Sequence, residues 1–202
     1  MKTNNVVVYP VEVEYLYAAL IIFFLAGTLV EYVWTKHTQP AYYSRRDMSA
    51  SLKFFLSDIA INFVVKTGAL FILFKLSHYS LFSLNYQWWV WLLCFIFWDF
   101  LVYCEHVLEH NVRFMWAVHI NHHSSEHMNL STALRSPTFM AVYRYFFYAP
   151  IIMIGFPLAM FLVVFILGKS WAFFTHCQLF GNWNFVERVM VTPSHHRVQI
   201  GR

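Results

Sequence analysis

The sequence predicts an all-α protein: a multi-pass transmembrane bundle of about four or five helices with a cytoplasmic, histidine-rich helical cap. The first observation behind this prediction is composition. Hydrophobic residues make up 59% of the 202 residues and charged residues only 12%, whereas soluble domains have about 45–50% and about 25%. The second is a series of long apolar stretches, and the third is the presence of eleven histidines among so few charges. This composition excludes soluble, disordered and fibrous classes. The basic residues are scattered, which argues against a nucleic-acid binder despite a net charge of +4.

Five apolar stretches are each close to the length that a membrane helix requires. A bilayer core about 30 Å thick needs about 20 residues of helix. The first stretch is expected to be an uncleaved anchor, because residues 1–14 lack the basic segment that opens a signal peptide. The last two are expected to form a hairpin. The stretches are 15–34, 54–76, 86–103, 138–156 and 157–176.

The short loops predict the orientation of the chain, because cytoplasmic loops are rich in Lys and Arg. The loop 35–53 carries four basic residues, whereas the loop 77–85 carries none. The first loop is therefore expected on the cytoplasmic side, with residues 104–137 and 177–202 beside it. The four basic residues are Lys36, Arg45, Arg46 and Lys53.

The second apolar stretch contains polar residues at helical spacing. Asp58, Asn62 and Lys66 follow one another at intervals of four, which places them on one helix face. Because charged groups in lipid cost several kcal/mol, this face is expected to pack against other helices.

A second polar stripe leads out of the third apolar stretch. At about 100° per residue, Asp99, Tyr103, His106 and His110 project within an arc of about 60°. Asp99 and Tyr103 are the candidate catalytic residues of this stripe. Asp99 is expected to orient a histidine as an outer carboxylate, and the alternative is an ion pair with Lys66.

A further histidine group follows closely in sequence. His119, His122 and His123 project within about 100° of one another if residues 119–123 are helical. Imidazole suits Zn, Cu, Fe and Ni, and the two groups together provide more ligands than one ion needs. The remaining loop or ambiguous histidines are His37, His78, His127 and His195.

These motifs resemble the histidine boxes of the fatty acid hydroxylase/sterol desaturase superfamily. Residues 98–110 (WDFLVYCEHVLEH) resemble the first box and residues 119–123 (HINHH) the second. Residues 129–135 (NLSTALR) are similar to the flank of the second box, and 192–198 (TPSHHRV) to the third region. The resemblance covers half of the chain. It divides the chain into N-terminal transmembrane helices (1–97) and a histidine-box domain (98–202).

The resemblance implies an integral membrane oxygenase that uses O2 and two iron ions to hydroxylate, desaturate or cleave a lipid such as a sterol, fatty acid or alkylglycerol. It also implies an external electron donor, such as a ferredoxin, a cytochrome b5 or a pterin. The expected membrane is a bacterial inner membrane or the endoplasmic reticulum. The implied metal ligands are His106, His110, His119, His122, His123, His176 and His196.

The chain departs from the family pattern in its third box. Members have H-x-x-H-H there, whereas in this chain Gln199 and Ile200 occupy the places of the last two histidines. The chain also stops at Arg202, so a truncated chain is expected. These departures leave an alternative open: an inactive relative, or a non-enzymatic membrane metal-binding protein with an incomplete site.

Overall fold

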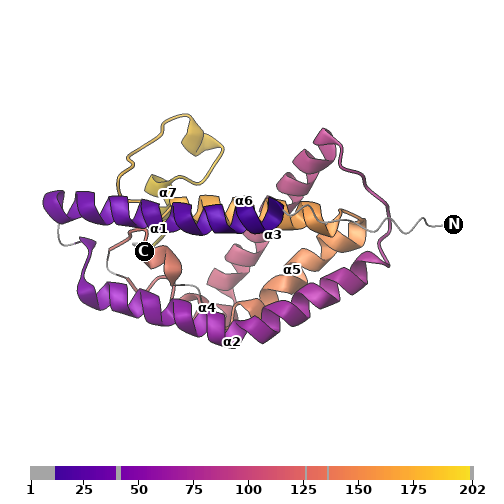
Figure 1. Cartoon of the computed structure of the whole chain (residues 1–202), viewed down its shortest axis with the longest axis horizontal. Helices are drawn as coiled ribbons and strands as arrows, with labels where there is room; N and C mark the ends of the chain where they lie inside the picture. Colours follow the sequence, from indigo (N-terminus) through magenta and orange to yellow (C-terminus); the bar gives the residue numbers. More distant parts are fainter. Residues whose placement is uncertain (1–11, 40–41, 126, 136, 201–202) are drawn as a thin grey trace.

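The computed structural model describes residues 12–39, 42–125, 127–135 and 137–200, and over these residues the chain is helical without strands (Figure 1). This confirms the predicted all-α class. The α-helices are α1 (Glu12–Thr38), α2 (Arg45–Ser77), α3 (Trp88–Asn111), α4 (Arg113–His119), α5 (Ala141–Ile154), α6 (Leu158–Phe174) and α7 (Pro193–Ile200). Two short 3-10 helices are η2 (Thr132–Leu134) and η3 (Val186–Arg188).

Two of the described helices, α2 and α3, are long and apolar enough to cross a membrane. Helices α5 and α6 are also apolar but have only 14 and 17 residues, which correspond to about 21 and 26 Å. The predicted hairpin 138–176 therefore forms from helices shorter than expected. Its turn contains Gly155, whose φ of 121° suits glycine.

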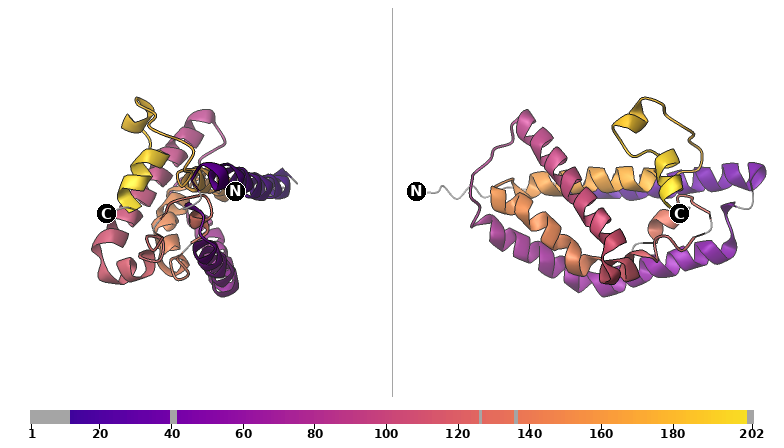
Figure 2. Two further views of the ribbon diagram at one scale, coloured as in Figure 1. Left: turned by 90° about the vertical axis from the view of Figure 1, so that its left-hand side faces the viewer. Right: turned by 180° about the vertical axis from the view of Figure 1, so that it is seen from behind.

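The helices form an elongated bundle in which α3 crosses the others obliquely (Figures 1 and 2). Helix α2 packs against α5, and α3 packs against both α5 and α6. The main hydrophobic core lies where these helices meet. Its largest members include Trp98, Tyr148, Ile151, Met160 and Phe161.

A glycine allows the close approach of α3 to α6. A Cβ atom added at Gly168 would lie 1.8 Å from Cη2 of Trp98, a ring that is itself buried. The indole therefore fills the space that a side chain at position 168 would need. This contact fixes the position of α3, which carries the first histidines.

The polar stripe of α2 faces other helices, as predicted. Asp58 and Asn62 are buried, and Asn62 Nδ2 donates to Asp58 Oδ1 at 2.8 Å and to the Thr138 carbonyl. Lys66 Nζ lies 2.5 Å from Asp58 Oδ2. The alternative pairing of Lys66 with Asp99 is therefore wrong, because Asp58, one turn before Asn62 on the same helix, is the partner.

A buried glutamate, Glu31, connects elements of the cap that are distant in sequence. Glu31 of α1 is fully buried and accepts hydrogen bonds from the backbone N–H groups of Leu130 at 2.7 Å and Gln178 at 2.5 Å, and from the Tyr43 hydroxyl. One carboxylate thus ties α1 to the loops before α5 and after α6.

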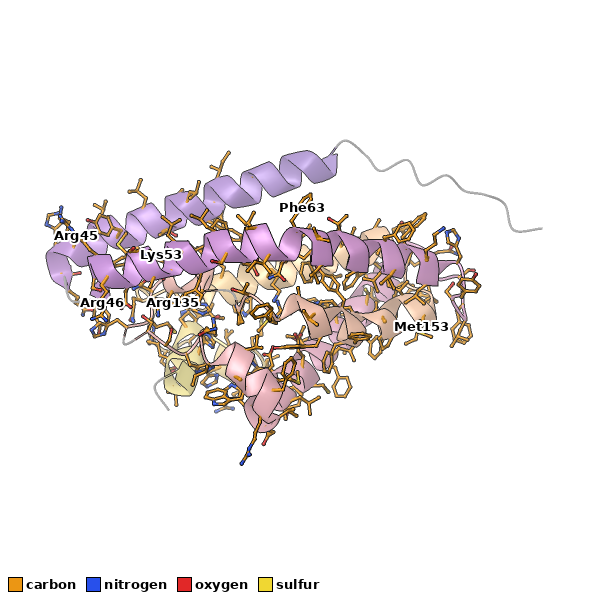
Figure 3. All side chains as sticks on the ribbon, turned by 90° about the horizontal axis from the view of Figure 1, so that it is seen from below. Arg45, Arg46, Lys53, Phe63, Arg135 and Met153 are labelled. Atoms are coloured by element: carbon orange, nitrogen blue, oxygen red, sulfur yellow. The ribbon has the colours of Figure 1, made fainter. Side chains whose placement is uncertain are left out.

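Arg135 connects the loop after the second histidine box to α2. Its guanidinium donates to Ser51 Oγ at 3.1 Å, to Ser124 Oγ at 2.9 Å and to Asp47 Oδ1 at 2.5 Å. Figure 3 shows Arg135 beside the N-terminal turns of α2, where Arg45 also lies. The base of the cap is therefore an interconnected polar network.

Candidate metal centre

All seven predicted ligand histidines converge in the cap. Neighbouring imidazole rings have centroids between 4.5 Å (His176–His196) and 5.9 Å (His122–His196) apart. They come from different parts of the chain. His106 and His110 lie on the last turns of α3, His119 ends α4, His122 and His123 follow it, His176 follows α6, and His196 lies on α7.

The expected helix through residues 119–123 does not form. Helix α4 ends at His119, and tighter turns follow it: the N–H of His122 donates to the His119 carbonyl at 2.9 Å, and that of His123 to the Ile120 carbonyl at 3.1 Å. This turn separates the two histidines. His123 stays with the histidines of α3, while His122 faces those near α6 and α7.

The first group consists of His106, His110, His119 and His123. One ring nitrogen from each of the first three lies within 4.8 Å of the others. His123 joins them because its Nε2 lies 3.1 Å from Nε2 of His119.

The second group consists of His122, His176 and His196. Nε2 of His176 lies 3.2 Å from Nε2 of His122 and 3.2 Å from Nε2 of His196. The two groups adjoin, because the rings of His119 and His122 have centroids 5.6 Å apart.

In His176 and His122, a contact of Nδ1 with a backbone carbonyl leaves Nε2 free to donate an electron pair to a metal. Nδ1 of His176 donates to the Ala172 carbonyl at 2.8 Å, and Nδ1 of His122 points at the Arg135 carbonyl at 3.4 Å. A neutral imidazole with its proton on Nδ1 presents a lone pair on Nε2. Lone pairs that face one another at 3.2 Å repel unless a cation lies between them. Their spacing suits neighbouring ligands of one ion, each about 2.0–2.1 Å from the metal as in zinc sites, so these residues fit a metal centre.

The family model for fatty acid hydroxylase matches residues 91–198, a segment that contains all seven histidines. The chain belongs to the fatty acid hydroxylase family. This confirms the resemblance on which the ligand prediction depends.

Similar proteins carry the name alkylglycerol monooxygenase. The human protein is 37% identical over 127 residues, which are 62% of this chain and 28% of the relative. The protein of Xenopus tropicalis is 32% identical over 193 residues, which are 94% of this chain and 42% of the relative. The chain thus spans less than half the length of these relatives. No solved structure matches it.

In this fatty acid hydroxylase family member, a buried glutamate contacts the first histidine group. Glu109 Oε2 lies 3.0 Å from Nδ1 of His119 and 3.5 Å from Nδ1 of His106, and its other oxygen accepts from the Tyr143 hydroxyl at 2.8 Å. Glu109 is 2% exposed. Sequence reasoning missed it, although its spacing three residues after His106 was a usable signal.

The predicted catalytic residues, Asp99 and Tyr103, lie on α3 before the histidines His106 and His110. Asp99 is exposed, and among the described residues it makes no hydrogen bond or ion pair. Tyr103 is 65% exposed on the same face. Both lie on the stripe that ends at His106 and His110, so their functional role stays a prediction.

Burial and the proximity of other imidazoles lower the pKa of His122, His123 and His176. Burial, followed by the proximity of His196, lowers the pKa of His176 to about 3. Burial, followed by His119 and His110, lowers the pKa of His123 to about 4. The pKa of His122 is well below its usual value for the same reasons. Because metal binding needs neutral imidazole, these groups are ready to bind an ion at neutral pH.

The two undecided histidines have other neighbours. His127 packs edge-on against Tyr42, with centroids 5.1 Å apart. His195 is half exposed, with Nε2 3.8 Å from Glu187. The side chains of Gln199 and Ile200 lie outside the described part of the chain, as does Arg202.

Proposed function

We propose that this chain carries the di-iron centre of a membrane-bound monooxygenase that hydroxylates a lipid with O2. The observation that supports this most is the presence of two adjoining imidazole groups whose Nε2 atoms converge at 3.1–3.2 Å. Seven nitrogen donors exceed the needs of one ion, and imidazole is a suitable ligand for iron. Membership of the fatty acid hydroxylase family favours iron over other metals.

We propose an alkylglycerol as the substrate, because the relatives are named for that activity. One oxygen atom of O2 would enter a C–H bond of the lipid to give a hydroxyl group, and the other would leave as water. This balance needs two electrons and two protons, which an external reductant would supply. Iron bound in the cap would supply the activation of O2.

The protein's own part in this proposal is to hold and shield the centre. The buried rings of His119 and His176 exclude water, and Glu109 fixes the imidazoles of His106 and His119 through their Nδ1 atoms. An outer carboxylate of this kind sets ring orientation and raises the basicity of the ligand.

We propose that the lipid approaches along the exposed face of α3. Tyr103 and Asp99 lie on this face, which runs from the apolar part of α3 to His106 and His110. A substrate dissolved in the bilayer would reach the cap without crossing water. The basic residues around Arg45 and Lys53 favour a cap on the cytoplasmic side of a multi-pass protein.

The test is O2 consumption by protein purified in detergent, loaded anaerobically with Fe(II), and supplied with a reductant and an alkylglycerol. O2 uptake with a hydroxylated lipid product is expected, together with loss of both in His119→Ala and His122→Ala. His78→Ala is the control, because His78 is an exposed residue that packs on Phe74 after the end of α2. Bound metal without O2 uptake would support the inactive alternative instead.

A further inference from the structure

We propose that the segment 179–191, named here the interfacial loop, inserts its apolar side chains into the headgroup layer of the bilayer beside the cap. This inference concerns a lipid surface and does not depend on the identity of the metal or substrate. The loop connects α6 to α7 and includes η3. Figures 1 and 2 show it projecting sideways from the bundle, with no other helix covering its outer side in these views.

The interfacial loop exposes several large apolar side chains. Phe185 is 72% exposed and Val189 is 75% exposed. Large apolar side chains exposed close together on a protein surface often mark interaction sites. The other large exposed apolar residues of the loop are Leu179, Phe180, Met190 and Val191.

Contacts with α6 set the level of the loop relative to the membrane. Trp171, in the last turns of α6, donates from Nε1 to the Val191 carbonyl at 3.0 Å. Phe174, the final residue of α6, packs against Phe180 and Trp183, with ring centroids 4.9 and 5.8 Å apart. The loop is thus fixed where an apolar helix ends. Trp residues gather near the ends of apolar helices in membrane proteins, at the level of the headgroups, so the loop lies where an interfacial segment is expected.

Internal hydrogen bonds hold the loop in shape. The carboxylate of Glu187 accepts from the Trp183 N–H at 3.1 Å and from Thr192 Oγ1 at 2.9 Å, and it also binds the Ser194 hydroxyl. Because Glu187 is tied to the base of the loop, its neighbours Phe185 and Val189 point outward. The exposed Arg188 between them is placed to meet lipid phosphate.

Insertion of the loop into the headgroup layer would affect the second histidine group, because the loop lies between His176 and His196 in the sequence. The loop begins shortly after His176 and ends shortly before His196, and Arg197 ties the two ends together by donating to the Cys177 and Phe180 carbonyls at 3.2 and 2.8 Å. Contact with the bilayer would therefore restrict the motion of the segment that carries both histidines.

The experiment measures membrane depth with a nitroxide attached at Val189→Cys, in the protein reconstituted into phosphatidylcholine nanodiscs. Cys104→Ser is used as background, because Cys94 and Cys177 are buried. Relaxation of the label is measured with O2, which concentrates in lipid, and separately with a nickel chelate, which stays in water. Phe63→Cys, on the exposed face of α2, is the bilayer reference, and Arg46→Cys, at its N-terminus, is the water reference (Figure 3).

The label at Val189 is expected to respond more strongly to O2 than to the nickel chelate, as at Phe63, and the opposite order is expected at Arg46. Strong relaxation by the nickel chelate at Val189 would place the loop in water and overturn the proposal. Protection from both agents would show that protein covers the loop, and this result would also overturn it. Neither outcome depends on oxygenase activity, so failure here is separate from failure of the proposed function.

Discussion

The Nδ1 atoms of three cap histidines contact different groups. Because Nδ1 and Nε2 lie on opposite sides of the ring, this contact determines where Nε2 points. His176 uses the Ala172 carbonyl, His122 the Arg135 carbonyl, and His119 the Glu109 carboxylate. The hydrogen bond to Ala172 holds the His176 ring in one orientation before a metal binds, and the nearby Glu109 carboxylate favours one orientation of the His119 ring. Preorganisation of this kind reduces the cost of assembling the centre on binding.

Glu109→Ala is expected to weaken metal binding about 10- to 100-fold, the usual cost of losing an outer partner. Glu109→Gln should lose less, because its amide oxygen can still accept from an Nδ1–H group. The measurement is metal affinity by competition with a chelator. Asp99→Asn is the matched control on the same helix, and it should bind metal normally. The reverse result would assign the orienting role to Asp99, as the sequence suggested.

The lowered pKa values predict how the stability of the metal-free protein depends on pH. His123 and His176 have pKa values of about 4 and about 3 in the folded state, whereas unfolded histidine has a pKa of about 6.5. Between these values the unfolded chain binds more protons, so the free energy of unfolding rises with pH and falls as pH drops below about 6.5. The thermal midpoint in detergent should therefore fall between pH 7 and pH 5. A midpoint that stays constant over this range would contradict the pKa assignment.

Single elements show how far the sequence predicts the fold. The spacing of Asp58, Asn62 and Lys66 correctly predicted a buried face on α2, because the 3.6-residue period is a local property. The end of α4 at His119 was not predicted, since no Gly or Pro marks it. The roles of Glu31 and Arg135 were also not foreseen, because their partners are distant in sequence and depend on the folded chain.

The same distinction applies to the candidate centre. All seven histidines that converge were named from the sequence, because the ordered boxes are specific to a family, and their role as metal ligands stays a prediction. Their division into two groups was not, because it depends on the turn that separates His122 from His123. Glu109 was overlooked because its burial follows from the packing of α3 against α4 and α5.

Helices α3 and α6 approach each other closely where the Trp98 ring lies against Gly168. Gly168→Ala places a Cβ atom against the buried Trp98 ring and should destabilise the protein by about 1–3 kcal/mol, as overpacking usually does. Gly68→Ala is the control, because a Cβ there meets no atom within 4 Å. Thermal unfolding in detergent compares the two variants. Equal midpoints would show that the helices do not approach this closely.

At the scale of the whole molecule, distant segments must be folded together before the centre exists. The first group needs α3 and α4, whereas the second also needs the end of α6 and α7. The cap and the bundle are therefore expected to gain stability together when a metal binds, because a ligand specific for the folded state stabilises it. The shortage of charged residues is consistent with this arrangement, since much of the chain is apolar scaffold for one polar centre.

We propose that the two imidazole groups hold two irons, and the iron content of the purified protein decides whether they do. Protein reconstituted anaerobically in detergent should hold about two irons per chain, since the seven donors exceed one ion's needs. His110→Ala with His123→Ala should remove the first ion, and His176→Ala with His196→Ala the second, leaving about one iron in each case. An iron content of about one or less per chain in the unmodified protein, unchanged in both double variants, would show that the cap does not hold two irons.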